Sequence, residues 1–114
     1  MRGLYIIDAD HIIRPCDDIT VWGRCMADRE LRRVARTTIG DVDISTVFLG
    51  MDHGWGWMEL ERPVPPVVFE TMTFGPAPIE GICARCCTWE EAETQHREVC
   101  DEVRAALARS TDAN

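Results

Sequence analysis

Two β-rich runs separated by a two-residue turn constrain the fold of this chain more than any other feature. They cover Val34 to Ile39 and Val42 to Met51, with Gly40-Asp41 between them. A glycine-containing dipeptide between two such runs predicts a β-hairpin. Because side chains alternate along a strand, four residues of the second run share one face: Val42, Ile44, Thr46 and Phe48. The far end of this run is apolar on both faces, which predicts a strand in the interior of a sheet.

The other segments supply further strands and two helices. Strands are expected at Leu4 to Ile7, His11 to Arg14, Val67 to Phe74 and Ile82 to Cys86. One helix is expected from a cap at Asp17 or Asp18 to about Asp28. A second begins at the capping box formed by Thr88 and Glu91. This order predicts an α+β fold, with a mainly antiparallel sheet of four to six strands and two helices packed on one face.

Apolar spacing predicts which helical side chains face the sheet. In the first helix these are Ile19, Trp22 and Met26, with Cys25 beside them. In the second helix, which runs to about Arg109, the stripe comprises Trp89, Ala92, His96, Val99, Val103 and Leu107. The polar residues 110–114 that follow are expected to be disordered.

Length and charge limit the classes of function. The 114 residues indicate a single domain, 1–114. The formal net charge of −8 argues against general nucleic-acid binding, because neutralising phosphates requires a basic surface. All twelve basic residues are Arg, which reflects either genome composition or bidentate capture of phosphate or carboxylate groups. A few arginines can form a local positive pocket, so the net charge does not exclude binding of a small anionic ligand.

The sequence also indicates a compartment. No apolar run approaches the roughly 18 residues that span a bilayer, and Asp8 interrupts the first apolar stretch before it reaches signal-peptide length. We therefore expect a cytoplasmic protein without a membrane partner. Six cysteines in such a chain are more typical of free thiols or a metal site than of a disulfide framework.

Cys83-x-x-Cys86 and His96-x-x-x-Cys100 form a candidate zinc site. Tetrahedral zinc takes four such ligands, commonly two from each chelating element. Cys83 and Cys86 would share a turn, and His96 and Cys100 lie four residues apart on one helix face. The alternatives are buried free thiols, since cysteine is a good small core residue, and adventitious disulfides. Zinc is the one cofactor that the sequence suggests.

Asp52-His53 ends a strand and opens a glycine-rich loop, where functional sites are often placed. With Glu70 and His96 these residues could form an acid–base set or a metal site. In the alternative interpretation Asp52 caps the turn, His53 lies on the surface and Glu70 pairs with an arginine across the sheet. A buried His96 needs a partner, which would be a backbone carbonyl, Glu70 or a metal shared with Cys100. No nucleophile elbow, phosphate loop or zinc-protease motif is present, so an enzyme has little support.

Trp55 and Trp57 lie in the glycine-rich loop, where large rings are hard to bury. Such rings can stack on a base or contact a partner protein. The loop and an edge strand leave apolar surface that a domain of 12.9 kDa hides poorly, which predicts a homo-oligomer. Arg97 and Arg104 flank the stripe of the last helix and could line an anion site between two copies.

Three segments together resemble a family of small phage and prophage proteins, mostly of unknown function. They are Ser45 to His53 (STVFLGMDH), Phe69 to Gly75 (FETMTFG) and Thr88 to His96 (TWEEAETQH), accompanied by Asp17-Asp18 and Trp22. The resemblance covers most of the chain. This sequence departs from the pattern in the loop Gly54 to Pro66, which is longer and carries two tryptophans, and at Cys86-Cys87.

By analogy, the resemblance implies a non-enzymatic anti-defence protein in the cytoplasm of a bacterial host. Small phage proteins of this size include oligomeric sponges that sequester nucleotide-derived immune signals, such as the cyclic ADP-ribose signals of the Thoeris defence. A sponge would stack aromatic rings on a base and pair arginines with phosphates. The candidate ligand-binding residues are Trp22, Asp52, His53, Trp55, Trp57, Glu70, Phe74, His96, Arg97 and Arg104. Two further hypotheses are a zinc-stabilised adaptor that binds a host protein through the Trp55/Trp57 loop and a small hydrolase.

Overall fold

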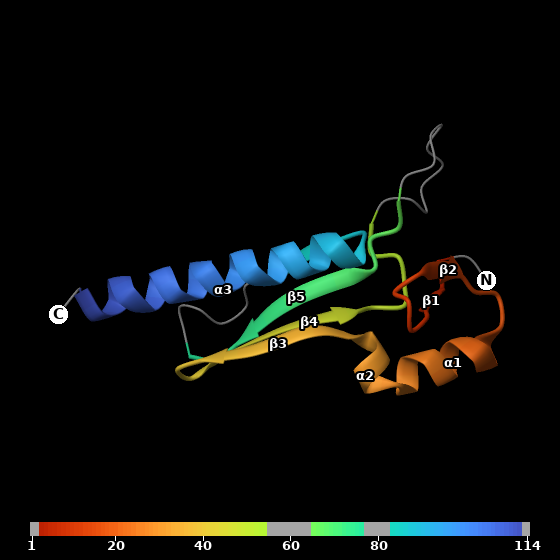
Figure 1. The fold of residues 1–114 in the computed structure, drawn as a ribbon, viewed down its shortest axis with the longest axis horizontal. Coiled ribbons are helices and arrows are strands. Elements are labelled where there is room, and N and C mark those ends of the chain that lie inside the picture. Colours follow the sequence, from red (N-terminus) through yellow and green to blue (C-terminus); the bar gives the residue numbers. More distant parts are fainter. Residues whose placement is uncertain (1–2, 55–64, 77–82, 113–114) are drawn as a thin grey trace.

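The hairpin predicted around Gly40-Asp41 forms half of a four-stranded sheet (Figure 1). In this computed structural model, which describes residues 3–54, 65–76 and 83–112, β3 (Arg33–Ile39) pairs antiparallel with β4 (Val42–Phe48). The register leaves two residues to connect the strands. Gly40 has a φ of 59°, a left-handed conformation that tight hairpin turns require and that glycine adopts without strain. The predicted hairpin is confirmed.

Two more strands, β5 (Phe69–Phe74) and β6 (Cys83–Cys86), complete this sheet in the order β3-β4-β5-β6. All neighbouring pairs are antiparallel. β4 therefore has a partner on each side, as its apolar far end predicted, and β6 lies at the edge, as expected. The buried residues of β4 are the four that were predicted to share a face: Val42, Ile44, Thr46 and Phe48.

A small second sheet and two short helices lie at one end of the molecule (Figure 1). β1 (Tyr5–Ile7) pairs antiparallel with β2 (Ile13–Pro15), and α1 (Ile19–Ala27) follows. Directly after α1 comes α2 (Arg29–Arg32), a single helical turn that the sequence analysis did not anticipate.

Two aspartates set the ends of these short helices. The Asp18 carboxylate caps α1 by accepting hydrogen bonds from the backbone N–H groups of Thr20 and Val21, at 2.9 and 3.3 Å. Asp28, expected near the end of the first helix, also caps α2 by accepting from the N–H of Leu31 at 3.0 Å. The chain therefore leaves α1 and enters β3 through a fixed helical turn.

The final helix, α3 (Trp89–Asp112), lies along the four-stranded sheet and contacts all four strands (Figure 1). Its capping box forms as predicted. The Thr88 hydroxyl accepts from the N–H of Glu91 at 3.1 Å, and the Glu91 carboxylate accepts from the N–H of Thr88 at 3.0 Å. The helix continues to Asp112, beyond the expected end at Arg109. Residues 110–112, which we expected in a disordered tail, are therefore helical.

Length explains why α3 is the helix that covers this sheet. Its 24 residues extend about 36 Å, whereas a strand of seven residues extends about 23 Å. α1 lies instead beside β1. The predicted class, α+β with a mainly antiparallel sheet, is confirmed, although the strands divide into two sheets. Within the described ranges, no helix is long and apolar enough to cross a bilayer.

The position of α1 also corrects one predicted core residue. Ile19 is 54 % exposed, because its helix lies beside β1 and not on the face that α3 covers. By contrast, the predicted stripe of α3 is confirmed. Its central positions Ala92, His96, Val99 and Val103 are buried, and Trp89 and Leu107 at its ends are half-buried.

Two apolar clusters fill the interface between α3 and the sheet. The cluster near the β3–β4 turn comprises Val42, Ile44, Val99, Cys100 and Val103. The cluster near the start of α3 comprises Ile7, Phe48, Val68, Phe69 and Ala92. The rings of Phe48 and Phe69 meet edge to face in the second cluster, with centroids 5.6 Å apart. Between the two clusters the interface is polar.

His96 occupies this polar centre and is only 5 % exposed. Its Nδ1 lies 2.7 Å from the Thr46 hydroxyl, and its Nε2 lies 2.8 Å from the Thr37 hydroxyl. Thr46 also contacts the Thr71 hydroxyl at 2.6 Å, and the Gln95 amide donates to Thr71 at 3.0 Å. A neutral imidazole has one donor and one acceptor nitrogen, so hydroxyls satisfy the whole ring. The partners are therefore threonines, not the carbonyl, carboxylate or metal that the sequence suggested.

Burial lowers the pKa of His96 below its ordinary value. The unfolded chain, with an imidazole pKa of about 6.5, therefore takes up the proton first as the pH falls. The stability contributed by the neutral ring is fully present above about pH 6.5 and is lost as the pH falls through the folded-state pKa.

Replacing His96 tests this account. His96→Gln should lower the free energy of unfolding by about 1–3 kcal/mol at about pH 7.5, because the threonine network loses a partner of matching shape. Wild type should lose more stability than His96→Gln between about pH 7.5 and about pH 5.5, since only wild type carries the buried imidazole. Urea denaturation at both pH values measures this, and the two other histidines, common to both proteins, cancel. An equal change in the free energy of unfolding of the two proteins between these pH values would contradict the stabilising role of the neutral His96 ring.

Candidate anion-binding site

Among the described elements, no helix covers the face of the four-stranded sheet opposite α3, and α2 borders one end of it. We call this the open face. Strand register places on it Arg33 and Arg36 of β3, Asp43, Ser45 and Val47 of β4, and Glu70, Met72 and Phe74 of β5. The open face therefore combines charged side chains with a few apolar ones.

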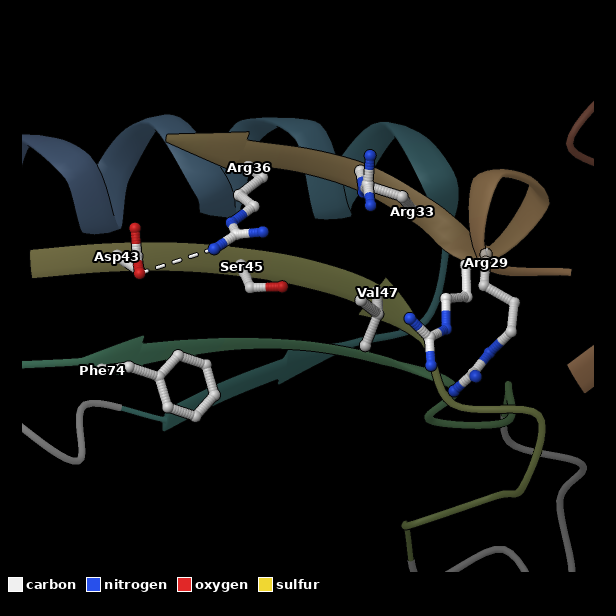
Figure 2. Close-up of a pocket in the computed structure, with 8 residues that line it drawn as sticks. Arg29, Arg33, Arg36, Asp43, Ser45, Val47 and Phe74 are labelled. Atoms are coloured by element: carbon white, nitrogen blue, oxygen red, sulfur yellow. Dashed lines mark ion pairs between the residues drawn. The ribbon is translucent and has the colours of Figure 1, made fainter. Parts of the chain in front are cut away.

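A pocket with a volume of about 340 Å³ lies on the open face (Figure 2). We call it the arginine pocket because four of its eight lining residues are arginines. The lining comprises Arg29, Arg32, Arg33, Arg36, Asp43, Ser45, Val47 and Phe74. This volume is at the lower end of the range typical of small-ligand sites, about 300–1,000 Å³.

Local backbone structure brings the arginines together. Arg29 and Arg32 belong to the single turn α2, and Arg33 begins β3 directly after it. Residues three apart on a regular strand point to opposite faces. The pairing of β3 with β4 shifts between Arg33 and Ala35, however, and this bulge accommodates one extra residue. Arg33 and Arg36 consequently both lie on the open face.

Two of the four guanidinium groups have protein partners. Arg32 donates from Nε to the backbone carbonyl of Phe48 at 3.1 Å and from Nη1 to that of Met26 at 3.0 Å. These bonds fix α2 against the end of β4. Arg36 forms an ion pair with Asp43, with Nη2 and Oδ2 3.5 Å apart (Figure 2).

The side chains of Arg29 and Arg33 make no ion pair or hydrogen bond with any residue in the described ranges. Both are exposed, in a chain with 20 acidic and 12 basic residues. The arginine pocket is therefore a local positive field on an acidic protein. A guanidinium offers a planar fork of donors that matches phosphate and carboxylate oxygens. Chemically, this arrangement suits capture of an anion.

Phe74 is the one predicted ligand-binding residue, among those the structure describes, that lines the arginine pocket. Its side chain is 52 % exposed and lies opposite Asp43 in the strand register. Figure 2 shows its ring at the end of the pocket remote from Arg29.

The four arginines were not among the predicted site residues, although the sequence carries a signal for them. Arg29, Arg32, Arg33 and Arg36 fall within the eight-residue stretch RELRRVAR, which holds a third of the basic residues of the chain. A dense basic run in an otherwise acidic sequence indicates a local anion site. What the run did not show is that a helical turn and a bulge direct all four side chains to one pocket.

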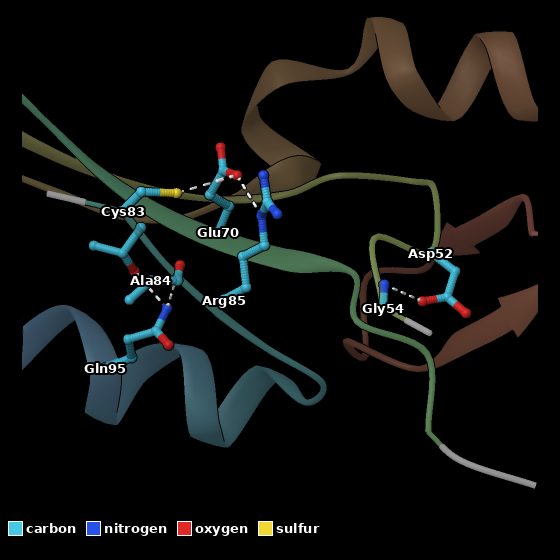
Figure 3. Close-up of polar contacts among 8 residues, drawn as sticks. Asp52, Gly54, Glu70, Cys83, Ala84, Arg85 and Gln95 are labelled. Carbon is cyan, nitrogen blue, oxygen red and sulfur yellow. Dashed lines mark hydrogen bonds and ion pairs between the residues drawn. The ribbon is translucent and has the colours of Figure 1, made fainter. Parts of the chain in front are cut away.

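Glu70 is engaged in an ion pair beside the pocket (Figure 3). Its Oε2 accepts from Arg85 Nε at 2.8 Å and from the Cys83 thiol at 3.6 Å. The structural interpretation, an arginine pair across the sheet, is therefore correct for this residue. Glu70 faces the open side and His96 lies under the other face, so the sheet separates them.

Asp52 and His53 also take structural positions. Asp52 Oδ1 accepts from the backbone N–H of Gly54 at 2.8 Å (Figure 3) and from that of Val67 at 2.9 Å. His53 is exposed, and its backbone N–H donates to the carbonyl of Val67 at 2.8 Å. The acid–base set of Asp52, His53, Glu70 and His96 is therefore not assembled.

The predicted zinc ligands do not converge. Cys83 and Cys86 belong to a strand rather than a turn, so Cys83 points to the open face and Cys86 to the face covered by α3. Cys100 packs in an apolar cluster, and both nitrogens of His96 bind threonines. No group of three or more His, Cys, Asp or Glu side chains in the described part of the chain is arranged to hold a metal ion.

The surroundings of Cys83 and Cys86 favour the neutral thiol over the thiolate. Burial raises the pKa of Cys86 to about 11, with nearby Glu91 adding to the shift. Burial and then Glu70 raise the pKa of Cys83. The cysteines of the described residues are free, in line with the alternative of unpaired thiols.

The remaining predicted ligand residues lie away from the pocket. Trp22 donates from its indole Nε1 to the carbonyl of Gly50 at 2.9 Å, which ties α1 to the chain after β4. Gly50 has a φ of 74° and lies against Trp22 and Met26, so no side chain fits there.

The two arginines predicted to bind anions lie on α3, across the sheet from the arginine pocket. Arg97 contacts the Thr94 hydroxyl at 3.3 Å, and Arg104 pairs with Asp101 at 3.2 Å. Trp55 and Trp57 lie outside the described residues.

Comparison with known proteins found nothing to which this chain is similar: no family model, curated protein or solved structure matches it. The resemblance to small phage proteins stays a prediction from the three sequence motifs. The arginine pocket therefore stands on its own geometry as the candidate functional site.

Substitution of Asp52 tests its structural role. Asp52→Ala should lower the free energy of unfolding by about 1–2 kcal/mol, because two backbone N–H groups lose their acceptor. Asp52→Asn keeps one acceptor oxygen and should lose less than half as much. Urea denaturation of the three proteins measures this order. Equal stability of all three proteins would show that the hydrogen bonds from Gly54 and Val67 to Asp52 contribute nothing to the free energy of unfolding.

Proposed function

We propose that this protein binds and sequesters a small anionic, nucleotide-like ligand in the arginine pocket. The observation that carries the proposal is the pair Arg29 and Arg33, whose side chains have no partner among the described residues and share the pocket with an exposed phenyl ring. Guanidinium groups bind phosphates, and an aromatic ring offers a surface on which a base stacks.

Electrostatics supports an anion as the occupant. Four guanidinium groups gathered around one pocket repel one another, and only Arg36 has a carboxylate partner in the described structure. The chain has 20 acidic residues that could have neutralised this cluster. A bound phosphate would relieve the repulsion that Arg29 and Arg33 experience.

A small molecule is favoured over a polynucleotide. The net charge of −8 would repel a long polyanion outside the pocket. We expect a ten-nucleotide oligothymidylate to bind more weakly than a single nucleotide. Tighter binding of the oligonucleotide would reassign the pocket to nucleic acid.

Sequestration, rather than turnover, is part of the proposal. The resemblance to small phage proteins favours an anti-defence sponge, whose ligand is a nucleotide immune signal of the host. A sponge releases its ligand intact when it is denatured. Mass spectrometry of the small molecules released from protein purified out of signalling cells would identify the ligand, and recovery of a cleaved product instead would indicate an enzyme.

We include a homo-oligomer in the proposal. Several large apolar side chains are exposed in the β1–β2 unit, in α1 and just after β4: Ile12, Ile19, Val21 and Met51. In the proposal these side chains are buried against a second copy, which removes apolar surface from water. Light scattering should give a mass of at least two chains. Ile19→Asp combined with Val21→Asp should lower the measured mass toward that of one chain. A monomer mass for wild type would refute this part.

Charge reversal in the pocket tests anion binding. Arg29→Glu combined with Arg33→Glu should weaken binding of nucleoside diphosphates by about 100-fold or more, because two charged hydrogen-bonding groups are lost. Isothermal titration calorimetry measures the affinity. The proposal also predicts that added salt weakens wild-type binding.

The matched control is Arg97→Glu combined with Arg104→Glu, which changes net charge equally on the far side of the sheet. It should keep the wild-type affinity within about twofold, since distant exposed charges are screened. Equal loss in both double variants would mean that net charge, and not the arginine pocket, governs binding.

A further inference from the structure

The arginine pocket has two chemically different ends. Along β4, Asp43, Ser45 and Val47 follow one another on the open face. Phe74 lies opposite Asp43, and Arg33 lies opposite Val47. Four residues of strand separate these positions, which corresponds to about 13 Å.

One end is aromatic and carries the Asp43–Arg36 ion pair. Asp43 accepts a hydrogen bond from the Thr38 hydroxyl at 2.6 Å and pairs with Arg36. First Thr38 and then Arg36 lower the pKa of the Asp43 carboxyl, so it stays ionised. A carboxylate beside the Phe74 ring offers acceptor oxygens to hydrogen-bond donors, and its pairing with Arg36 leaves this end without net positive charge.

The other end is positive. Arg33 projects there from the first residue of β3, and Arg29 and Arg32 come from α2 (Figure 2). Arg32 is held by two backbone carbonyls, which leaves the guanidinium groups of Arg29 and Arg33 to meet a ligand. No carboxylate lines this end of the pocket within the described structure.

We propose that the pocket orients a nucleotide with more than one phosphate, with its base on Phe74 and its terminal phosphates on Arg29 and Arg33. This inference rests on the proposed function and adds the ligand class and its direction. The exocyclic amino groups and ring N–H groups of a base are donors, which suits the Asp43 end. The sugar and first phosphate would cross Ser45 and Val47, two small uncharged side chains that lie opposite Arg36 and Arg33 of β3.

The length of the pocket sets the ligand class. A nucleoside monophosphate places its phosphate one sugar away from the base. A diphosphate or triphosphate extends further and reaches both ends at once. We therefore expect affinity to rise from nucleoside to monophosphate to diphosphate.

Inorganic pyrophosphate separates the two ends experimentally, because it carries the phosphates without the ring. Calorimetric titrations would use pyrophosphate and each of the four ribonucleoside diphosphates with wild type, Phe74→Ala and Arg33→Glu. Phe74→Ala should weaken the best-bound nucleoside diphosphate by about 5- to 100-fold and leave pyrophosphate unchanged, because only the nucleotide stacks. Arg33→Glu should weaken both ligands. Phe74→Tyr keeps a ring and should restore nucleotide binding.

The outcomes distinguish this inference from the function on which it rests. Pyrophosphate that binds wild type as tightly as every nucleoside diphosphate, or a Phe74→Ala effect of equal size on both ligands, would overturn the two-ended site and leave anion binding intact. If neither pyrophosphate nor any nucleoside diphosphate binds at millimolar concentration, the proposed function itself is refuted.

Discussion

The hydrogen-bonded group around His96 is the interaction on which the rest of this structure depends. It lies between two apolar clusters at the middle of the α3–sheet interface. An apolar helix stripe alone could shift along an apolar sheet face at modest cost. A buried imidazole and its hydroxyl partners satisfy one another in a single register, and a shift would leave polar groups buried without partners. The network therefore fixes which residues of α3 meet which residues of β3, β4 and β5.

Fixing α3 on one face leaves the other face of the sheet to the charged side chains. Strand alternation sends Thr46 to α3 and Ser45 and Val47 to the open side. The bulge at the start of β3 then adds Arg33 to the side that Arg36 occupies. The bonds from Arg32 to two carbonyls hold α2 at the end of the sheet. Local positive charge on an acidic protein thus results from backbone geometry and not from overall composition.

The same alternation explains why the predicted zinc ligands and the predicted acid–base residues do not form sites. The spacing of Cys83 and Cys86 suits a chelating turn, but within β6 it places the two thiols on opposite faces. Glu70 and His96 are likewise separated by the sheet. In each case the residue types suit a known kind of site, but the side chains lie on opposite faces of the sheet, so the site does not form.

By itself the sequence determined the local features of this protein, because these depend on neighbours in the chain. The Gly40-Asp41 hairpin, a helix cap at Asp17 or Asp18, the Thr88 cap, the interior position of β4 and the buried stripe of α3 were all readable from spacing and residue type. The division into two sheets, the partners of His96 and the site itself were not. They arise from contacts between residues distant in the sequence, such as Arg36 with Asp43 across a hairpin and His96 with Thr46, and from the pocket that Phe74 lines together with the arginines of α2 and β3. Only the tertiary structure decides such contacts, because only packing selects which face of each strand is covered and which stays open to a ligand.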